Sequence, residues 1–131
     1  MQNQHVSNSK ILMKRQHFEF DLGDVCNAFL SEEKISVEIS DHFIRKFLAR
    51  SISITDVVNK FEAFLDQHYN DIIARLKYCH LGCDIRIVGR AQVLVLEAKT
   101  INSYDIHFTF ITIFDECGGL DVLLTGNEYY V

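Results

Sequence analysis

Near the middle of the chain, four side chains have the types and spacing of an anion-handling site. A histidine is followed by cations three, four and eight residues later, at His42, Arg45, Lys46 and Arg50. In a helix this spacing places all four on one face. Histidine titrates near neutral pH, and neighbouring cations can hold a phosphate beside it. The spacing therefore predicts phosphate chemistry centred on His42, with the three cations binding the phosphate.

The opposite face of the same segment is apolar, at Phe43, Ile44, Phe47 and Leu48, and is expected to face a core. Cleavage of RNA by its own 2′-hydroxyl needs a base, an acid for the leaving 5′ oxygen, and a cation near phosphorus. A face with histidine, arginine and lysine can supply part of each role. The alternative is a solvated face whose cations pair with nearby acids such as Glu38 or Asp41.

Other polar residues give weaker signals. His17 and Glu19 flank the apolar stripe of a predicted helix, and spacing alone makes them surface residues. His107 lies beside Thr109 on a predicted strand, where it is either a satisfied core or edge histidine or the lining of a cleft. The terminal Tyr129 and Tyr130 could stack on bases, but packing on the sheet is favoured.

Cys79, His80 and Cys83 lie close together in the sequence and could form a metal site. Structural zinc needs four ligands, commonly as two close pairs, and the chain has no second pair. A turn with partly buried thiols is the favoured interpretation. We therefore expect no metal and no cofactor.

Composition indicates one folded domain spanning residues 1–131, with about residues 1–9 as a flexible tail. Of the 131 residues, 48% are hydrophobic, which is enough for a core. No apolar run approaches the roughly 18 residues of a membrane span, and no signal peptide is evident, so we expect a cytoplasmic protein with reduced thiols. The net charge of −5 argues against strong non-specific binding of nucleic acid. For an RNA substrate we therefore expect either weak intrinsic binding or a helper that delivers the RNA.

Familiar catalytic motifs are missing from the sequence. The P-loop, the dinucleotide-binding glycine motif, the HExxH zinc motif and the GxSxG hydrolase motif are all absent. Nucleotide hydrolysis, dinucleotide chemistry and the common protease classes are therefore disfavoured.

Periodicity predicts helices in the first half of the chain. An apolar stripe repeats with helical spacing over about residues 10–31, although Gly23 interrupts it. Residues 35–39 alternate as a short strand, and Ser40 or Asp41 caps the His42 helix. Ser53 and Asp56 form a capping-box-like start for a helix over residues 54–67, and residues 71–77 add a further helical turn or two.

The second half of the chain alternates with the period of strands. Residues 84–88 and 92–98 predict a hairpin, and residues 104–114 predict a long strand with Phe114 on its apolar face. A turn at residues 117–119 and a last short strand at 121–124 follow. The predicted fold is α+β, with N-terminal helices packed on one face of a mostly antiparallel sheet of four to five strands.

Two segments carry a resemblance to a known family. The segment from Val37 to Val57 and the segment Arg15-Gln16-His17-Phe18-Glu19 resemble RegB-type phage endoribonucleases, a branch of the RelE-type ribonuclease fold. The resemblance covers the first helix and about residues 35–65, whereas the sheet matches only in outline.

The resemblance implies a metal-independent endoribonuclease that cuts early messenger RNA with the help of a ribosomal RNA-binding protein. It places a catalytic histidine at His42 and an important acidic residue at Glu19, with Lys46 where the family has arginine. The second family histidine falls at Glu62, and the nearest histidine, His68, lies six residues later. A carboxylate can act as a base, but it is a poorer leaving-group acid unless its pKa is raised.

Two hypotheses follow. The first is a monomeric endoribonuclease that uses His42, Glu19 and either Glu62 or His68, with messenger RNA delivered by the ribosome or a ribosomal protein. The second is a non-catalytic phage protein of the same fold that binds and modulates a host protein. The net acidity and the missing second histidine motivate the second hypothesis.

Overall fold

The structure is a computed structural model that describes residues 7–79, 81–102, 104–115 and 127–131. Three helices and five strands follow one another along the described residues. In chain order they are α1 (Asn8–Ala28), β1 (Ile35–Ile39), α2 (Asp41–Leu48), α3 (Ile54–Leu76), β2 (Cys83–Val88), β3 (Gln92–Ile101), β4 (Asp105–Asp115) and β5 (Glu128–Tyr130).

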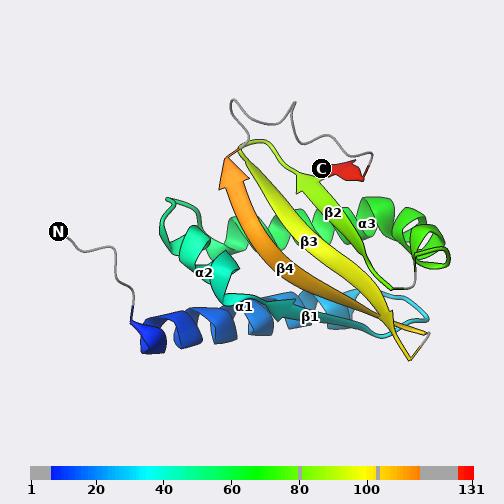
Figure 1. The fold of residues 1–131 in the computed structure, drawn as a ribbon, viewed down its shortest axis with the longest axis horizontal. Helices are drawn as coiled ribbons and strands as arrows, with labels where there is room; N and C mark the ends of the chain where they lie inside the picture. The colour runs from blue at the N-terminus through cyan, green and yellow to red at the C-terminus, as the bar shows by residue number, and fades with distance from the viewer. Residues whose placement is uncertain (1–6, 80, 103, 116–126) are drawn as a thin grey trace.

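The strands form one mixed sheet in the order β1-β4-β3-β2-β5. The inner pairs β2–β3 and β3–β4 are antiparallel, whereas the outer pairs β1–β4 and β2–β5 are parallel. Helix α3 lies behind the sheet, and α1 runs alongside β1 (Figure 1). The predicted α+β class, with helices on a mostly antiparallel sheet, is therefore confirmed.

Aromatic rings fill the core between the helices and the sheet. Six phenylalanine side chains are fully buried: Phe18, Phe43, Phe61, Phe64, Phe108 and Phe110. Phe61 of α3 packs against two rings of β4, and Phe43 joins α2 to Phe110 with centroids 5.5 Å apart and planes near perpendicular. Edge-to-face pairs of this kind stabilise a core beyond the area that they bury. They hold α2 and α3 against the same strand.

Serine side chains start the helices. The Ser40 Oγ accepts the Phe43 N–H at 3.0 Å, and the Ser53 Oγ accepts the Asp56 N–H at 3.1 Å. Both caps satisfy N–H groups that the first helical turn leaves unpaired. The two helical stretches predicted over residues 54–67 and 71–77 form one continuous helix, α3.

The long strand β4 departs from regular alternation. Leu96 of β3 pairs with Phe110, but the preceding Val95 pairs with Thr112, so β4 has one extra residue at Ile111. Such a bulge shifts the side chains beyond it to the other face. Ile113 is consequently buried and Phe114 is only half-buried. The prediction that Phe114 joins the apolar face was wrong for this reason.

The helix near the N-terminus and the strand near the C-terminus differ from those predicted from the sequence. The last two residues of the predicted tail, residues 8 and 9, belong to α1, and residues 1–6 lie outside the described part. The turn at 117–119 and the strand at 121–124 also lie outside it. Residues 128–130 form β5, a strand that alternation did not predict because it is so short. None of the three described helices combines the length and apolar character that a membrane crossing requires.

Helix α3 holds β5 through a small polar cluster. The Tyr129 hydroxyl donates to the Asp71 carboxylate at 2.6 Å, and the Arg75 Nε donates to the same carboxylate at 3.0 Å. The hydrogen bond from Tyr129, followed by that from Arg75, lowers the pKa of Asp71 below its usual range. The ionised carboxylate is therefore the form that the fold favours.

This lowered pKa makes the cluster sensitive to acid. A carboxyl whose pKa is depressed by folding stabilises the fold above its unfolded pKa of about 3.9, and this contribution is lost as the pH falls through the folded pKa. We expect Asp71→Asn to lose less unfolding free energy than the wild type between about pH 5 and pH 3, measured by urea denaturation. Asp66→Asn, at an exposed carboxylate of the same helix, is the control. Equal losses in the wild type and Asp71→Asn would contradict the assignment.

Candidate functional site

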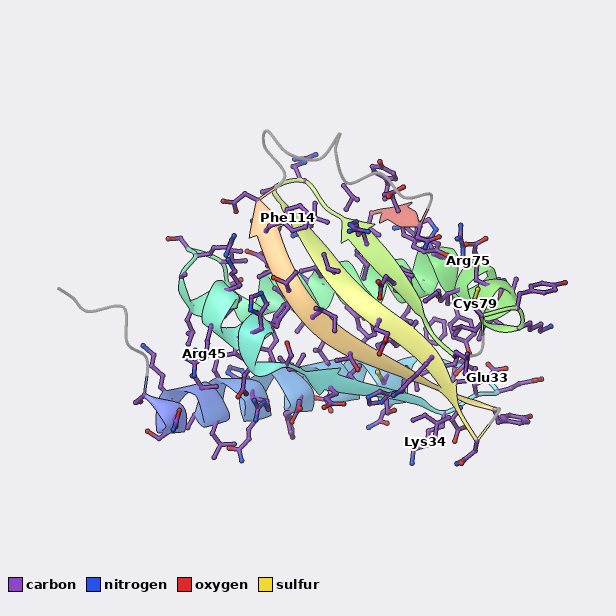
Figure 2. All side chains as sticks on the ribbon, viewed as in Figure 1. Glu33, Lys34, Arg45, Arg75, Cys79 and Phe114 are labelled. Atoms are coloured by element: carbon purple, nitrogen blue, oxygen red, sulfur yellow. The ribbon has the colours of Figure 1, made fainter. Side chains whose placement is uncertain are left out.

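Helix α2 presents a charged face to solvent beside the β1 edge of the sheet. His42, Arg45 and Lys46 are exposed, whereas Phe43, Ile44 and Phe47 are buried. The predicted separation of a polar and an apolar face is therefore present in α2. Figure 2 marks Arg45 on this helix, at the opposite end of the molecule from Arg75.

The two acids that precede the α2 cations most closely in the sequence form contacts with other residues. Asp41 forms an ion pair with Arg15 of α1, and Glu38 contacts His107 of β4 at 3.1 Å. Within the described residues, neither Arg45 nor Lys46 forms an ion pair. The alternative prediction was a solvated face on which Glu38 or Asp41 neutralises the α2 cations. In the structure, neither acid pairs with Arg45 or Lys46. Two positive charges remain available to an anion.

A hollow of about 480 Å³ lies where α1 passes the junction of β1 and α2. It is lined by Arg15, Glu19, Glu38, Ile39, Ser40 and Asp41. We call it the junction hollow. Its lining brings Glu19 of α1 to the residue directly before His42. Glu19 therefore lies at the same corner of the fold as Asp41, the residue before His42 in the chain. His42 itself is not part of the lining, and no hydrogen bond joins it to Glu19 within the described chain.

Packing of α1 explains why Glu19 reaches this corner. Phe18 is fully buried and meets Phe43 and Phe47 of α2 edge-on, with centroids 5.7 Å and 4.8 Å away. Glu19 follows it by one residue and so points about 100° around the helix. The ion pair between Arg15 and Asp41 fixes the same two helices on the hollow side.

Arg50 differs from the other two cations. Helix α2 ends at Leu48, so helical spacing does not extend to residue 50. The Arg50 Nη1 donates to the Lys46 carbonyl at 2.9 Å, and its Nε lies 3.5 Å from the Asp115 carboxylate. The Arg50 side chain is therefore held by the end of β4, and its charge is partly neutralised.

The two candidate partners on α3 have different surroundings. Glu62 is exposed, and it has no hydrogen-bond or ion-pair partner among the described residues. His68 is half-buried, with its Nε2 3.0 Å from the Tyr130 carbonyl oxygen of β5. Strand β5 is the edge of the sheet opposite β1, four strand spacings or about 19 Å away. The structure therefore places His68 far from the junction that precedes His42.

Two of the three candidate metal ligands, Cys79 and Cys83, lie in the described residues after α3. Cys79 is exposed and Cys83 half-buried, and both are free. Burial raises the pKa of Cys83. His80 lies outside the described residues, and the residues inside them contain no group of three or more potential metal ligands.

Sequence alternation did not reveal the surroundings of His107. Its Nδ1 lies 2.8 Å from the Ser36 Oγ, and its Nε2 lies 3.1 Å from the Glu38 Oε1. Ser36 and Glu38 are two residues apart on β1, so they share a face, and Ser36 pairs directly with His107 in the parallel register. The alternation was visible in the sequence, but the pairing of β1 with β4 was not.

Comparison with protein-family models, with curated proteins and with solved structures found no match for this chain.

Proposed function

We propose that this protein is a metal-independent endoribonuclease that cleaves messenger RNA by attack of the 2′-hydroxyl. The observation that carries the proposal is the junction hollow, where Glu19 enters from α1 beside Asp41, directly before His42. The free charges of Arg45 and Lys46 on the same helix as His42 support it. A base, an acid and cations are the groups that this reaction requires.

Each group has a role in the proposed reaction. The Glu19 carboxylate accepts the proton of the 2′-hydroxyl, whose oxygen then attacks phosphorus. His42 donates a proton to the leaving 5′ oxygen, and Arg45 and Lys46 stabilise the charge on the phosphate oxygens. The products are a 2′,3′-cyclic phosphate and a 5′-hydroxyl end. His68 has no role in this scheme because its ring contacts the Tyr130 carbonyl at the β5 edge, and the scheme assigns none to Glu62.

Overall charge governs how the substrate arrives. The chain carries a net charge of −5, so its long-range field repels RNA even though the α2 face is cationic. Weak intrinsic affinity is therefore expected, and delivery by the ribosome or a ribosomal protein would compensate for it.

The proposal is tested by incubating the full chain with messenger RNA that contains a purine-rich ribosome-binding sequence. EDTA is present throughout, and ribosomes are included or left out. We expect discrete cleavage in EDTA, with a higher rate when ribosomes are present. An RNA with 2′-deoxyribose at the cut site should resist cleavage. Intact RNA in both reactions would refute the proposal.

A second function is favoured by one surface feature. Met13 and Phe20 lie seven residues apart on α1, on the side opposite its buried stripe, and are 69% and 70% exposed. Both side chains offer apolar surface to solvent on the same side of α1, and exposed apolar surface is where protein partners bind when it forms a contiguous patch. This feature supports the alternative of a non-catalytic protein that binds a host protein.

A pull-down with purified tagged chain separates the two functions. The binding alternative expects a stoichiometric host partner that Phe20→Asp loses and His42→Ala retains. Recovery of no partner from host lysate, together with RNA cleavage by the same preparation, would leave the endoribonuclease as the function.

A further inference from the structure

The sheet face turned away from the helices carries a continuous chain of three polar side chains. Ser36 and Glu38 of β1 and His107 of β4 occupy this face, because their neighbours Ile35, Ile39 and Ile106 are buried in the core. The His107 ring stands between the other two, with contacts of 2.8 Å to Ser36 and 3.1 Å to Glu38. The order hydroxyl, imidazole, carboxylate is that of an activated nucleophile.

The chemistry of the carboxylate decides which ring nitrogen carries the proton. An ionised carboxylate only accepts hydrogen bonds, so the neutral His107 ring donates its Nε2–H to Glu38. The Nδ1 lone pair is then left for the Ser36 hydroxyl, which donates to it at 2.8 Å. The Ile106 carbonyl is the other acceptor near this hydroxyl, but it is 3.5 Å away and makes the weaker contact.

We propose that Ser36 is the nucleophile of an acyl-transfer site that hydrolyses short-chain carboxylic esters. His107 is its base, and Glu38 orients the ring. This site does not depend on the ribonuclease proposal, because that reaction assigns no role to Ser36, His107 or Glu38, although Glu38 also lines the junction hollow.

Proton and bond changes balance in two stages. The Ser36 oxygen bonds to the ester carbonyl carbon while its proton passes to the His107 Nδ1. The C–O bond to the alcohol then breaks, and the imidazolium returns the proton to the departing alcohol. A water molecule attacks the acyl-serine in the same way, which releases the acid and restores the hydroxyl. One ester and one water give one acid and one alcohol.

The surroundings favour a small substrate. The His107 side chain is 16% exposed and that of Glu38 63% exposed, so solvent reaches the three groups from the open face. Lys99 of β3 is exposed and lies directly opposite His107 in the antiparallel register. Its charge lies on the strand next to His107, on the side of β4 away from Ser36. None of the described hollows lies over Ser36, so the site offers no deep pocket for a long acyl chain.

A fluorophosphonate probe tests the nucleophile, since it forms a stable bond with an activated serine. We expect one probe per full-length chain by intact mass, located on Ser36 by peptide sequencing. Ser36→Ala should lose the label, and His107→Gln should be labelled about 100-fold more slowly, within the range for loss of a general base. Ser51→Ala, at an exposed serine between α2 and α3, should be labelled like the wild type.

The role of Glu38 needs a separate readout. A long-range ¹H–¹⁵N NMR spectrum at about pH 8 reports which nitrogen of the neutral ring holds the proton. We expect the Nε2–H form in the wild type and a mixture of both forms in Glu38→Ala. Circular dichroism checks that each variant is folded. The proposal would be overturned by a wild type that takes no label, by labelling that persists in Ser36→Ala, or by the Nδ1–H form in the wild type.

Discussion

Replacing His42 by glutamine is expected to lower the rate of RNA cleavage by about 10²- to 10⁴-fold, the usual contribution of a general acid. His42 is exposed on α2 and directly follows Asp41, which lines the junction hollow together with Glu19. Glutamine keeps a polar side chain but cannot donate a proton to the leaving 5′ oxygen. The rate is measured with excess enzyme over a single cut site, so that substrate delivery does not mask the chemical step.

His68→Gln is the matched control for this variant. It removes the same functional group from α3, where the His68 ring contacts the Tyr130 carbonyl at the far edge of the sheet. We expect its cleavage rate to stay within about twofold of the wild type. Equal loss in the two variants would mean that the effect of His42 is not local, and an unchanged rate in His42→Gln would remove it from the site.

The largest effect on stability is expected from Phe61→Ala, at about 3–5 kcal/mol. Phe61 is fully buried and lies 5.4 Å from the rings of both Phe108 and Phe110. Truncation removes apolar contacts and leaves a cavity between α3 and β4, which the surrounding rings can fill only in part. Urea denaturation measures the free energy of unfolding.

Phe20→Ala provides the comparison for Phe61→Ala. Its side chain is 70% exposed on α1, so we expect a change within about 0.5 kcal/mol. A loss below about 1 kcal/mol in Phe61→Ala would contradict the core described here, because so small a value is typical of surface positions.

Local patterns predicted the helices and strands well where one face is buried. The His42 helix illustrates this, because its apolar spacing and its Ser40 cap both appear in the structure. The bulge at Ile111 could not be predicted, since it depends on how β4 pairs with β3. Strand β5 is three residues long and is held by its pairing with β2, so it leaves almost no periodic signal.

The spacing of residues could group side chains of the candidate site only where they lie on the same helix. Spacing grouped His42, Arg45 and Lys46 because they lie on one short helix. It also included Arg50, which falls beyond the helix end and contacts Asp115. Contacts between segments that are distant in the sequence could not be predicted from the spacing of residues within one segment.

Two such contacts shape the site. Arg15 pairs with Asp41, and Glu38 pairs with His107, across separations that no periodicity reports. They explain why the cations of α2 remain free, because they occupy the acids nearest to those cations. The Glu38 contact depends on the pairing of β1 with β4, and the Arg15 contact depends on how α1 packs against α2.

The chemistry of the cut ends distinguishes attack by the 2′-hydroxyl from other routes of RNA cleavage. Products formed by the wild type in EDTA are separated, and the upstream fragment is examined for its terminal group by mass spectrometry. Attack by the 2′-hydroxyl predicts a 2′,3′-cyclic phosphate upstream and a 5′-hydroxyl downstream, with neither formed by His42→Gln. Upstream fragments that end in a 3′-hydroxyl, or RNA that stays intact with and without ribosomes, would contradict the account.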